Sequence, residues 1–267
     1  MTRTAISARE IGRADRAAAR RHRDTELTAW HDLMSSLDDA EWKRPTVCAG
    51  WDVADIVGHL CGQAEEVSKP WAYPLRDRRA RRVYPDVGLL DAHMLIQADD
   101  HRGTPYAELR TRFDKVWSKA TRTISRNPAL LRRLQIKVEG VPGFEQLELG
   151  YIQDILLARD LWMHRDDVCQ ALGRDFDAGP YAGEVVAQVM LDLVDGPFWP
   201  GTPVVLILTG QGGGSYRLGQ GEPIATVSTD AVGYLRTVSG RDDQPVVVVV
   251  DGDPLGAEAV AGCRMPF

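Results

Sequence analysis

The chain has 267 residues, of which 26% are charged and 44% hydrophobic, an ordinary composition for a globular protein. This composition excludes a disordered chain and a small disulfide-stapled domain, and no apolar run approaches the ~20 residues that a membrane span needs. The formal net charge of −6 argues against nucleic acid as a partner, because phosphate groups repel an acidic protein.

The first two thirds of the sequence predict helices. Apolar residues recur at helical spacing toward the end of residues 8–37, and the arginine-rich start of this range predicts an extended first helix. Asp52 and Asp55 have the spacing of a capping box at the start of a helix over 53–67. Residues 76–82 contain five arginines and are expected to form a solvated loop. Further helices are predicted over 87–100, 106–125 and 145–172.

The last third of the sequence has a different pattern. A helix is predicted over 181–194, a helical stretch over 230–238, and strands over 203–209, 215–218, 224–228 and 246–250. The five valines of the last strand are apolar on both faces, which predicts a central strand covered on both sides. Segment 210–214 is rich in glycine but lacks the Lys-Ser/Thr of a nucleotide loop, so it predicts a hairpin turn. We therefore expect an α+β protein, with a helical bundle in residues 1–178 and a small α/β domain in residues 179–267.

The cysteines form no CxxC pair, which is typical of a reduced chain in the cytoplasm. Helix geometry turns Cys61 roughly 200° away from His59, and Cys169 roughly 140° away from His164. Both are therefore expected to be small buried residues, and no cysteine of the protein is expected to act as a nucleophile. The four cysteines are Cys48, Cys61, Cys169 and Cys263.

The clearest chemical pattern is the pair Asp160 and His164. At a spacing of i, i+4 both side chains leave one face of a helix, one turn apart, as in helical metal sites. His59 lies in the middle of another predicted helix and is a candidate third ligand, which would leave a zinc ion one open position. An acid and a histidine at this spacing also form ordinary surface ion pairs, and a lone histidine in a helix is often a core residue. Spacing alone leaves these alternatives open.

Three blocks of the sequence resemble the mycothiol-dependent maleylpyruvate isomerase family. Residues 42–60, WKRPTVCAGWDVADIVGHL, resemble its first signature, which ends in a metal-binding histidine. Residues 157–173, LARDLWMHRDDVCQALG, resemble its second signature, in which an acid and a histidine lie four residues apart. Residues 204–241 resemble its smaller C-terminal domain. The resemblance implies a DinB-like four-helix bundle followed by a small α/β domain related to sterol-carrier-like folds.

The resemblance also implies the site. His59, Asp160 and His164 would bind zinc or another divalent metal, and mycothiol would be the thiol cosubstrate. The family commonly has glutamate where this chain has Asp160, whose carboxylate is one methylene shorter. Arg241 is the closest match to a catalytic arginine of the family, and a guanidinium suits a substrate carboxylate; the alternative is a surface arginine at a helix end. Gln153 precedes Asp160 by two helical turns and is a candidate for lining the cofactor pocket, with ordinary helix packing as the alternative.

The expected function is that of a mycothiol-dependent thiol transferase or a maleylpyruvate-isomerase-like isomerase. A metal-bound thiolate would attack a small electrophilic molecule, and the adduct would either rotate and collapse or persist as a conjugate. The alternatives are a non-catalytic protein that binds or carries a small molecule, and a metal-free biosynthetic cyclase or isomerase. The expected partners are therefore a small electrophile and a low-molecular-weight thiol, with neither nucleic acid nor a membrane.

Overall fold

The computed structural model describes residues 4–139, 143–241, 248–265 and 267. The protein divides into two compact units, which we describe separately: Arg16–Phe176, and a second unit that joins the N-terminal segment up to Asp15 with Asp177–Phe267. The expected boundary near residue 178 thus has a counterpart at Asp177. The sequence analysis assigned the N-terminal segment to the helical bundle, but this segment belongs to the second unit. The reason is that Ile6–Ser7 forms strand β1, which pairs in parallel with a strand of the second unit.

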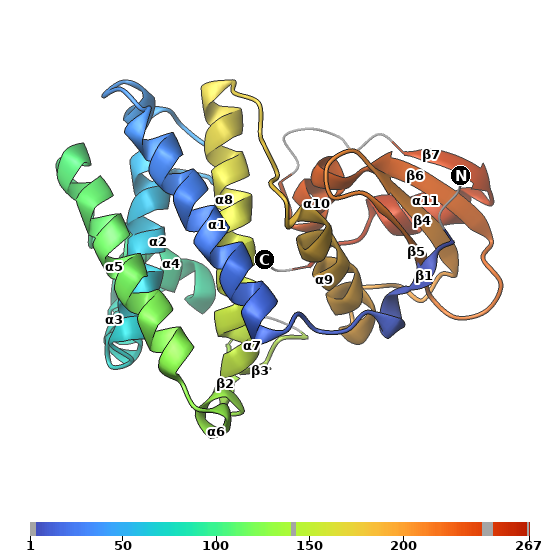
Figure 1. The fold of residues 1–267 in the computed structure, drawn as a ribbon, viewed down its shortest axis with the longest axis horizontal. Helices are drawn as coiled ribbons and strands as arrows, with labels where there is room; N and C mark the ends of the chain where they lie inside the picture. Colours follow the sequence, from blue (N-terminus) through green and yellow to red (C-terminus); the bar gives the residue numbers. More distant parts are fainter. Residues whose placement is uncertain (1–3, 140–142, 242–247, 266) are drawn as a thin grey trace. The chain divides into compact units, whose positions relative to one another are not determined.

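The unit Arg16–Phe176 is built on four long helices (Figure 1): α1 (Arg16–Ser35), α2 (Val53–Ser68), α5 (Tyr106–Arg126) and α8 (Leu157–Leu172). Helix α2 packs against α5 and α8, and α1 packs against the same two helices, so the four form a bundle. Two further helices, α3 (Ala72–Val83) and α4 (Leu89–Asp99), pack against α2 and against each other. The helices expected from residue 53 onward to residue 125 are therefore present, with α3 in addition.

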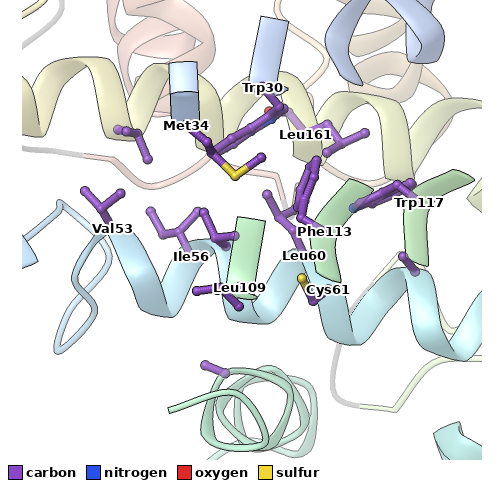
Figure 2. Close-up of a cluster of buried hydrophobic side chains, with 14 of the residues drawn as sticks. Trp30, Met34, Val53, Ile56, Leu60, Cys61, Leu109, Phe113, Trp117 and Leu161 are labelled. Carbon is purple, nitrogen blue, oxygen red and sulfur yellow. The ribbon is translucent and has the colours of Figure 1, made fainter. Parts of the chain in front are cut away.

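The core of this unit is a continuous cluster of apolar side chains. Each long helix contributes to it, as Figure 2 shows for Trp30, Leu60, Phe113 and Leu161. The indole nitrogen of Trp30 donates a 2.9 Å hydrogen bond to the main-chain oxygen of Leu161, which joins α1 to α8 without an unsatisfied buried donor. This cluster fixes the spacing of α2 and α8, the two helices that carry the site.

The loop expected over 76–82 is wrong, because these residues lie within α3. Arg76 is buried, and its guanidinium donates hydrogen bonds to Glu65, Glu66 and Asp100 at 2.6, 3.1 and 2.8 Å. The three acids supply the partners that a buried cation needs, so the basic stretch can fold as a helix against α2 and α4.

The segment expected to be one helix over 145–172 is interrupted. It begins with strand β3 (Gln146–Glu148), which pairs with the preceding strand β2 (Gln135–Lys137), and continues with α7 (Leu149–Tyr151) and a π-helical turn over Ile152–Leu156 before α8. Short segments η1 (Ala8–Glu10), η2 (Glu41–Lys43) and α6 (Ala129–Arg132) complete the order of elements before residue 177. Helix α8 ends at Gly173, which has the left-handed conformation (φ 63°) that favours glycine at a helix end.

The second unit is built on a five-stranded sheet with the strand order β1-β5-β4-β6-β7. Strands β4 (Val204–Thr209) and β5 (Gly214–Leu218) form the expected hairpin, while β4 and β6 (Ala225–Asp230) run parallel. Helices α9 (Ala182–Asp195), α10 (Ala231–Val238) and α11 (Pro254–Ala261) pack against these strands. An α+β fold class is therefore confirmed, and no helix among the described residues is long and apolar enough to cross a membrane.

The strand expected at 246–250 is not central. Strand β7 (Val249–Gly252) is the last strand of the sheet and pairs only with β6 in the described sheet order. Val249 is 67% exposed, although a central strand would bury it. Residues 246 and 247 lie outside the described residues.

Candidate metal centre

The site begins with the local structure that places His59. The side chain of Asp52 accepts a 2.9 Å hydrogen bond from the main-chain nitrogen of Asp55, and Asp55 reaches back to the nitrogen of Asp52. This capping box, expected from the sequence, fixes the start of α2 and therefore the direction in which His59 projects. His59 is fully buried, in line with its place in an apolar helix.

His59, Asp160 and His164 meet between α2 and α8. Nε2 of His59 lies 3.3 Å from one carboxylate oxygen of Asp160, and Nε2 of His164 lies 3.4 Å from the other. The two imidazole rings are 5.2 Å apart between centroids and nearly perpendicular. One donor atom from each of the three residues lies within 4.8 Å of the others.

These separations suit one divalent ion. Two atoms bound tetrahedrally to zinc at about 2.0–2.1 Å lie roughly 3.3 Å from each other. Both separations measured to Asp160 are close to this value, and two imidazoles with a carboxylate are a donor set that zinc accepts. The shorter carboxylate of Asp160 therefore reaches both histidines, although it replaces the glutamate common in the resembling family.

The second nitrogen of His164 is held by another acid. Nδ1 of His164 lies 3.0 Å from a carboxylate oxygen of Asp167, whose side chain is fully buried. A carboxylate at this position takes the N–H of a metal-binding imidazole and leaves the opposite nitrogen free for the ion. The sequence analysis missed Asp167, although its i, i+3 spacing from His164 on α8 was available as a signal.

The electrostatics of the site favour a positive charge. Burial would raise the pKa of Asp160, but the charge of His164 and a hydrogen bond with His59 outweigh burial and hold this pKa well below its usual range. Burial would lower the pKa of His164, but the charge of Asp160 and the hydrogen bond with Asp167 raise it to about 10. Burial lowers the pKa of His59. In the metal-free protein a proton on His164 thus balances the negative charge of the neighbouring carboxylates. A bound cation would be stabilised by the same carboxylates.

Gln63 is a further member of the site that the sequence analysis missed. It follows His59 by one helical turn on α2, and its amide nitrogen donates a 2.7 Å hydrogen bond to Asp160. The same nitrogen lies 3.1 Å from Nε2 of His59. Gln63 therefore orients the carboxylate of Asp160 from the side of α2.

The loop before α2 covers the site. Trp51 is buried and its ring lies 5.1 Å from that of His59 and 6.3 Å from that of His164, between centroids. Its main-chain nitrogen donates to the carbonyl of Cys48 at 2.9 Å, in a turn where Gly50 has a φ of 77°. The turn brings Cys48 to the site as well, 4.0 Å from Nδ1 of His164. Sequence spacing did not indicate this placement, because it depends on the turn and not on a helix face.

The remaining two predicted residues have other surroundings. The side-chain oxygen of Gln153 accepts a 3.1 Å hydrogen bond from Asn127, and Gln153 lies in the π-helical turn. An i→i+5 turn shifts the faces of a helix, so counting two α-helical turns back from Asp160 does not locate this side chain. Arg241 lies in the second unit, just after α10, where its main-chain nitrogen donates to the carbonyl of Arg236. The catalytic role of Arg241 and the cofactor role of Gln153 stay predictions.

Comparison with known proteins identifies the family of the chain. A model of the mycothiol maleylpyruvate isomerase N-terminal domain matches residues 23–169, more than half of the chain. The chain belongs to this family. The match includes α2 and most of α8, and family membership makes the protein an enzyme of the isomerase or thiol-transferase type. No curated protein matches the sequence.

Solved structures show a similar fold over most of the chain. Among those similar to it are crystal structures of the mycothiol-dependent maleylpyruvate isomerase and of a histidine-to-alanine mutant of that enzyme. Their TM-scores are 0.58 and 0.59, and each comparison covers 91% of this chain and 95% of the other. The sequence identities are only 13% and 12%, so this likeness establishes the fold.

Proposed function

We propose that this family member is a metal-dependent enzyme that uses mycothiol to isomerise a small electrophilic substrate or to conjugate it with the thiol. The observation that carries the proposal is the convergence of His59, Asp160 and His164 from two helices at separations that suit one ion. Three protein ligands leave one position of a tetrahedral ion open, which is the mark of a catalytic zinc site.

The residues of the site have separate roles in this proposal. His59, Asp160 and His164 hold the ion, which would stabilise the thiolate of mycothiol and so make it a nucleophile at neutral pH. Asp167 fixes the orientation of the His164 ring, and Gln63 fixes the carboxylate of Asp160. Trp51 packs beside the two imidazole rings.

Two assignments rest on the family alone. Arg241 would bind a carboxylate of the substrate, because a guanidinium makes two parallel hydrogen bonds to such a group. Gln153 would line the pocket for the thiol. A cytoplasmic location is part of the proposal, and the cysteines of the described residues, all of them free, agree with a reducing compartment.

The decisive experiment measures metal and thiol together. Wild-type protein stripped with a chelator and then given zinc is expected to retain about one ion per chain and to bind mycothiol in calorimetry. His164→Ala is expected to lose both, while His31→Ala, at an exposed histidine of α1, keeps both. Zinc-loaded wild-type protein that binds no thiol would contradict the proposed cosubstrate. Wild-type protein that retains no metal would favour the alternative of a non-catalytic binding protein.

A further inference from the structure

A second group of donor atoms surrounds the other nitrogen of His164. Sγ of Cys48 lies 3.6 Å from Oδ2 of Asp167 and 4.0 Å from Nδ1 of His164. The same oxygen of Asp167 lies 3.0 Å from this nitrogen. One donor atom of each residue lies within 4.8 Å of the other two, so Cys48, His164 and Asp167 also form a three-donor set.

We propose that Cys48, Nδ1 of His164 and Asp167 form a second metal position, which selects thiophilic cations and excludes an ion from the first position. A sulfur and a nitrogen or oxygen bound tetrahedrally to zinc at about 2.3 and 2.0–2.1 Å lie roughly 3.5 Å apart. The two separations from Sγ of Cys48 are near this value, so an ion can enter with small side-chain adjustments. The thiol proton of Cys48 leaves to solvent when the sulfur binds the ion.

The two positions exclude each other because they share one imidazole. A neutral imidazole has a lone pair on only one of its nitrogens, and the other nitrogen carries the proton. An ion bound at Nε2 leaves the N–H at Nδ1, where Asp167 accepts it. An ion bound at Nδ1 leaves the N–H at Nε2, where Asp160 lies 3.4 Å away. Each state thus has an acid for the proton, and His164 serves one ion at a time.

The donors determine which ions prefer each position. The first position offers two nitrogens and an oxygen, whereas the second replaces one imidazole by a thiolate. Thiolate sulfur is a soft ligand and favours the soft ions cadmium and cuprous copper over harder ions. A soft ion at Cys48 would take His164 from the first position, so thiophilic metals would compete with the proposed catalytic ion.

Access also distinguishes Cys48 from the other cysteines. Cys48 is half-buried in the turn before α2, whereas Cys61, Cys169 and Cys263 are buried. Burial raises the pKa of Cys61 and of Cys169, and it raises the pKa of Cys263 to about 11. A cation arriving from solvent therefore meets Cys48 before the other thiols.

Cadmium titration of the metal-free full chain tests the second position. Thiolate binding gives a sulfur-to-cadmium charge-transfer absorption in the ultraviolet, which nitrogen and oxygen ligands do not produce. We expect this band to rise to one equivalent in the wild type, to vanish in Cys48→Ser and to persist in Asp160→Asn, in which the first position loses its charge while the amide oxygen can still accept the Nε2 proton of His164. Cys169→Ser, at a buried cysteine on the same helix as His164, is the matched control and keeps the band.

Three results would overturn the inference. They are a wild type without the band, a band that survives Cys48→Ser, and two cadmium ions bound per chain in calorimetry, since His164 cannot serve both. Persistence of the band in Asp160→Asn makes the test independent of the proposed function, whose failure would appear instead in zinc and thiol binding.

A measurement on the unaltered protein covers the case in which Cys48→Ser fails to fold. Alkylation of Cys48 by iodoacetamide, followed by peptide mapping, is expected to slow about tenfold or more when cadmium is bound, because the coordinated sulfur is no longer a free nucleophile. An unchanged rate of alkylation in the presence of bound cadmium would contradict the assignment of Cys48 as a ligand.

Discussion

The carboxylate of Asp167 lies 3.0 Å from Nδ1 of His164, and both residues are almost fully buried on α8. The histidine is therefore held from the side opposite to the first metal position. We expect Asp167→Asn to lower zinc affinity roughly 10- to 100-fold, because the amide keeps the shape but loses the charge that raises the basicity of the imidazole.

Asp166→Asn is the matched control for this prediction. Asp166 is equally buried on the same helix, but its carboxylate accepts a hydrogen bond from Gln170 instead. Zinc competition with a chromophoric chelator measures both variants. Equal zinc affinities of the two variants would show that Asp167 does not orient the ligand.

The length of the acid at position 160 is tested by a pair of variants. Asp160→Asn removes the charge between the two imidazoles and is expected to weaken zinc binding at least about 100-fold, more than loss of a supporting residue does. Asp160→Glu keeps the carboxylate and introduces the residue common in the family, so we expect its affinity to stay within about tenfold of the wild type. A zinc titration in which Asp160→Glu behaves like Asp160→Asn would show that the shorter reach is required here.

Local sequence signals predicted the parts of the fold that are stabilised locally. The capping box of Asp52 and Asp55 and the left-handed Gly173 depend on contacts within a few residues, so their spacing was sufficient. His59 projects from the helix that the capping box begins, and Asp160 and His164 share one face of α8, so the sequence indicated the three side chains that lie together between α2 and α8.

The features that sequence reasoning missed depend on contacts distant in the chain. The helical state of residues 76–82 depends on Glu65 and Asp100, which pair with Arg76 across three helices. Strand β1 forms only by pairing with β5, more than 200 residues later. The valine run ends in an edge strand because apolar periodicity does not report which neighbours a strand has.

The buried side chain of Arg76 is expected to stabilise the helical unit. Its buried guanidinium donates to three carboxylates and to the carbonyl of Gly62, so truncation removes four hydrogen bonds and the cation that the three acids share. We expect Arg76→Ala to lower the free energy of unfolding by about 3–5 kcal/mol, as for other broken buried ion pairs. Arg78→Ala, at an exposed arginine of the same helix, is expected to change it by less than about 0.5 kcal/mol. Urea denaturation compares the two, and similar losses would contradict a structural role for Arg76.

His22 gives the protein a pH-dependent stability. Burial, together with the positive charges of Arg165 and Arg23, lowers the pKa of His22 from 6.5 to about 4. Between these values the unfolded chain binds a proton that the folded chain does not, so the free energy of unfolding falls as the pH drops from about 6.5 to about 4. The loss amounts to roughly 3 kcal/mol over this window and levels off below it.

The variant His22→Gln isolates this contribution, because a glutamine has no proton to bind in either state. Urea denaturation of metal-free wild type and His22→Gln at pH 7, 6, 5 and 4.5 measures the difference between their free energies of unfolding. The wild type is expected to lose stability more steeply than the variant, while other buried histidines such as His59 and His101 affect both proteins alike. Parallel curves for the two proteins would mean that the two arginines and burial do not keep His22 neutral.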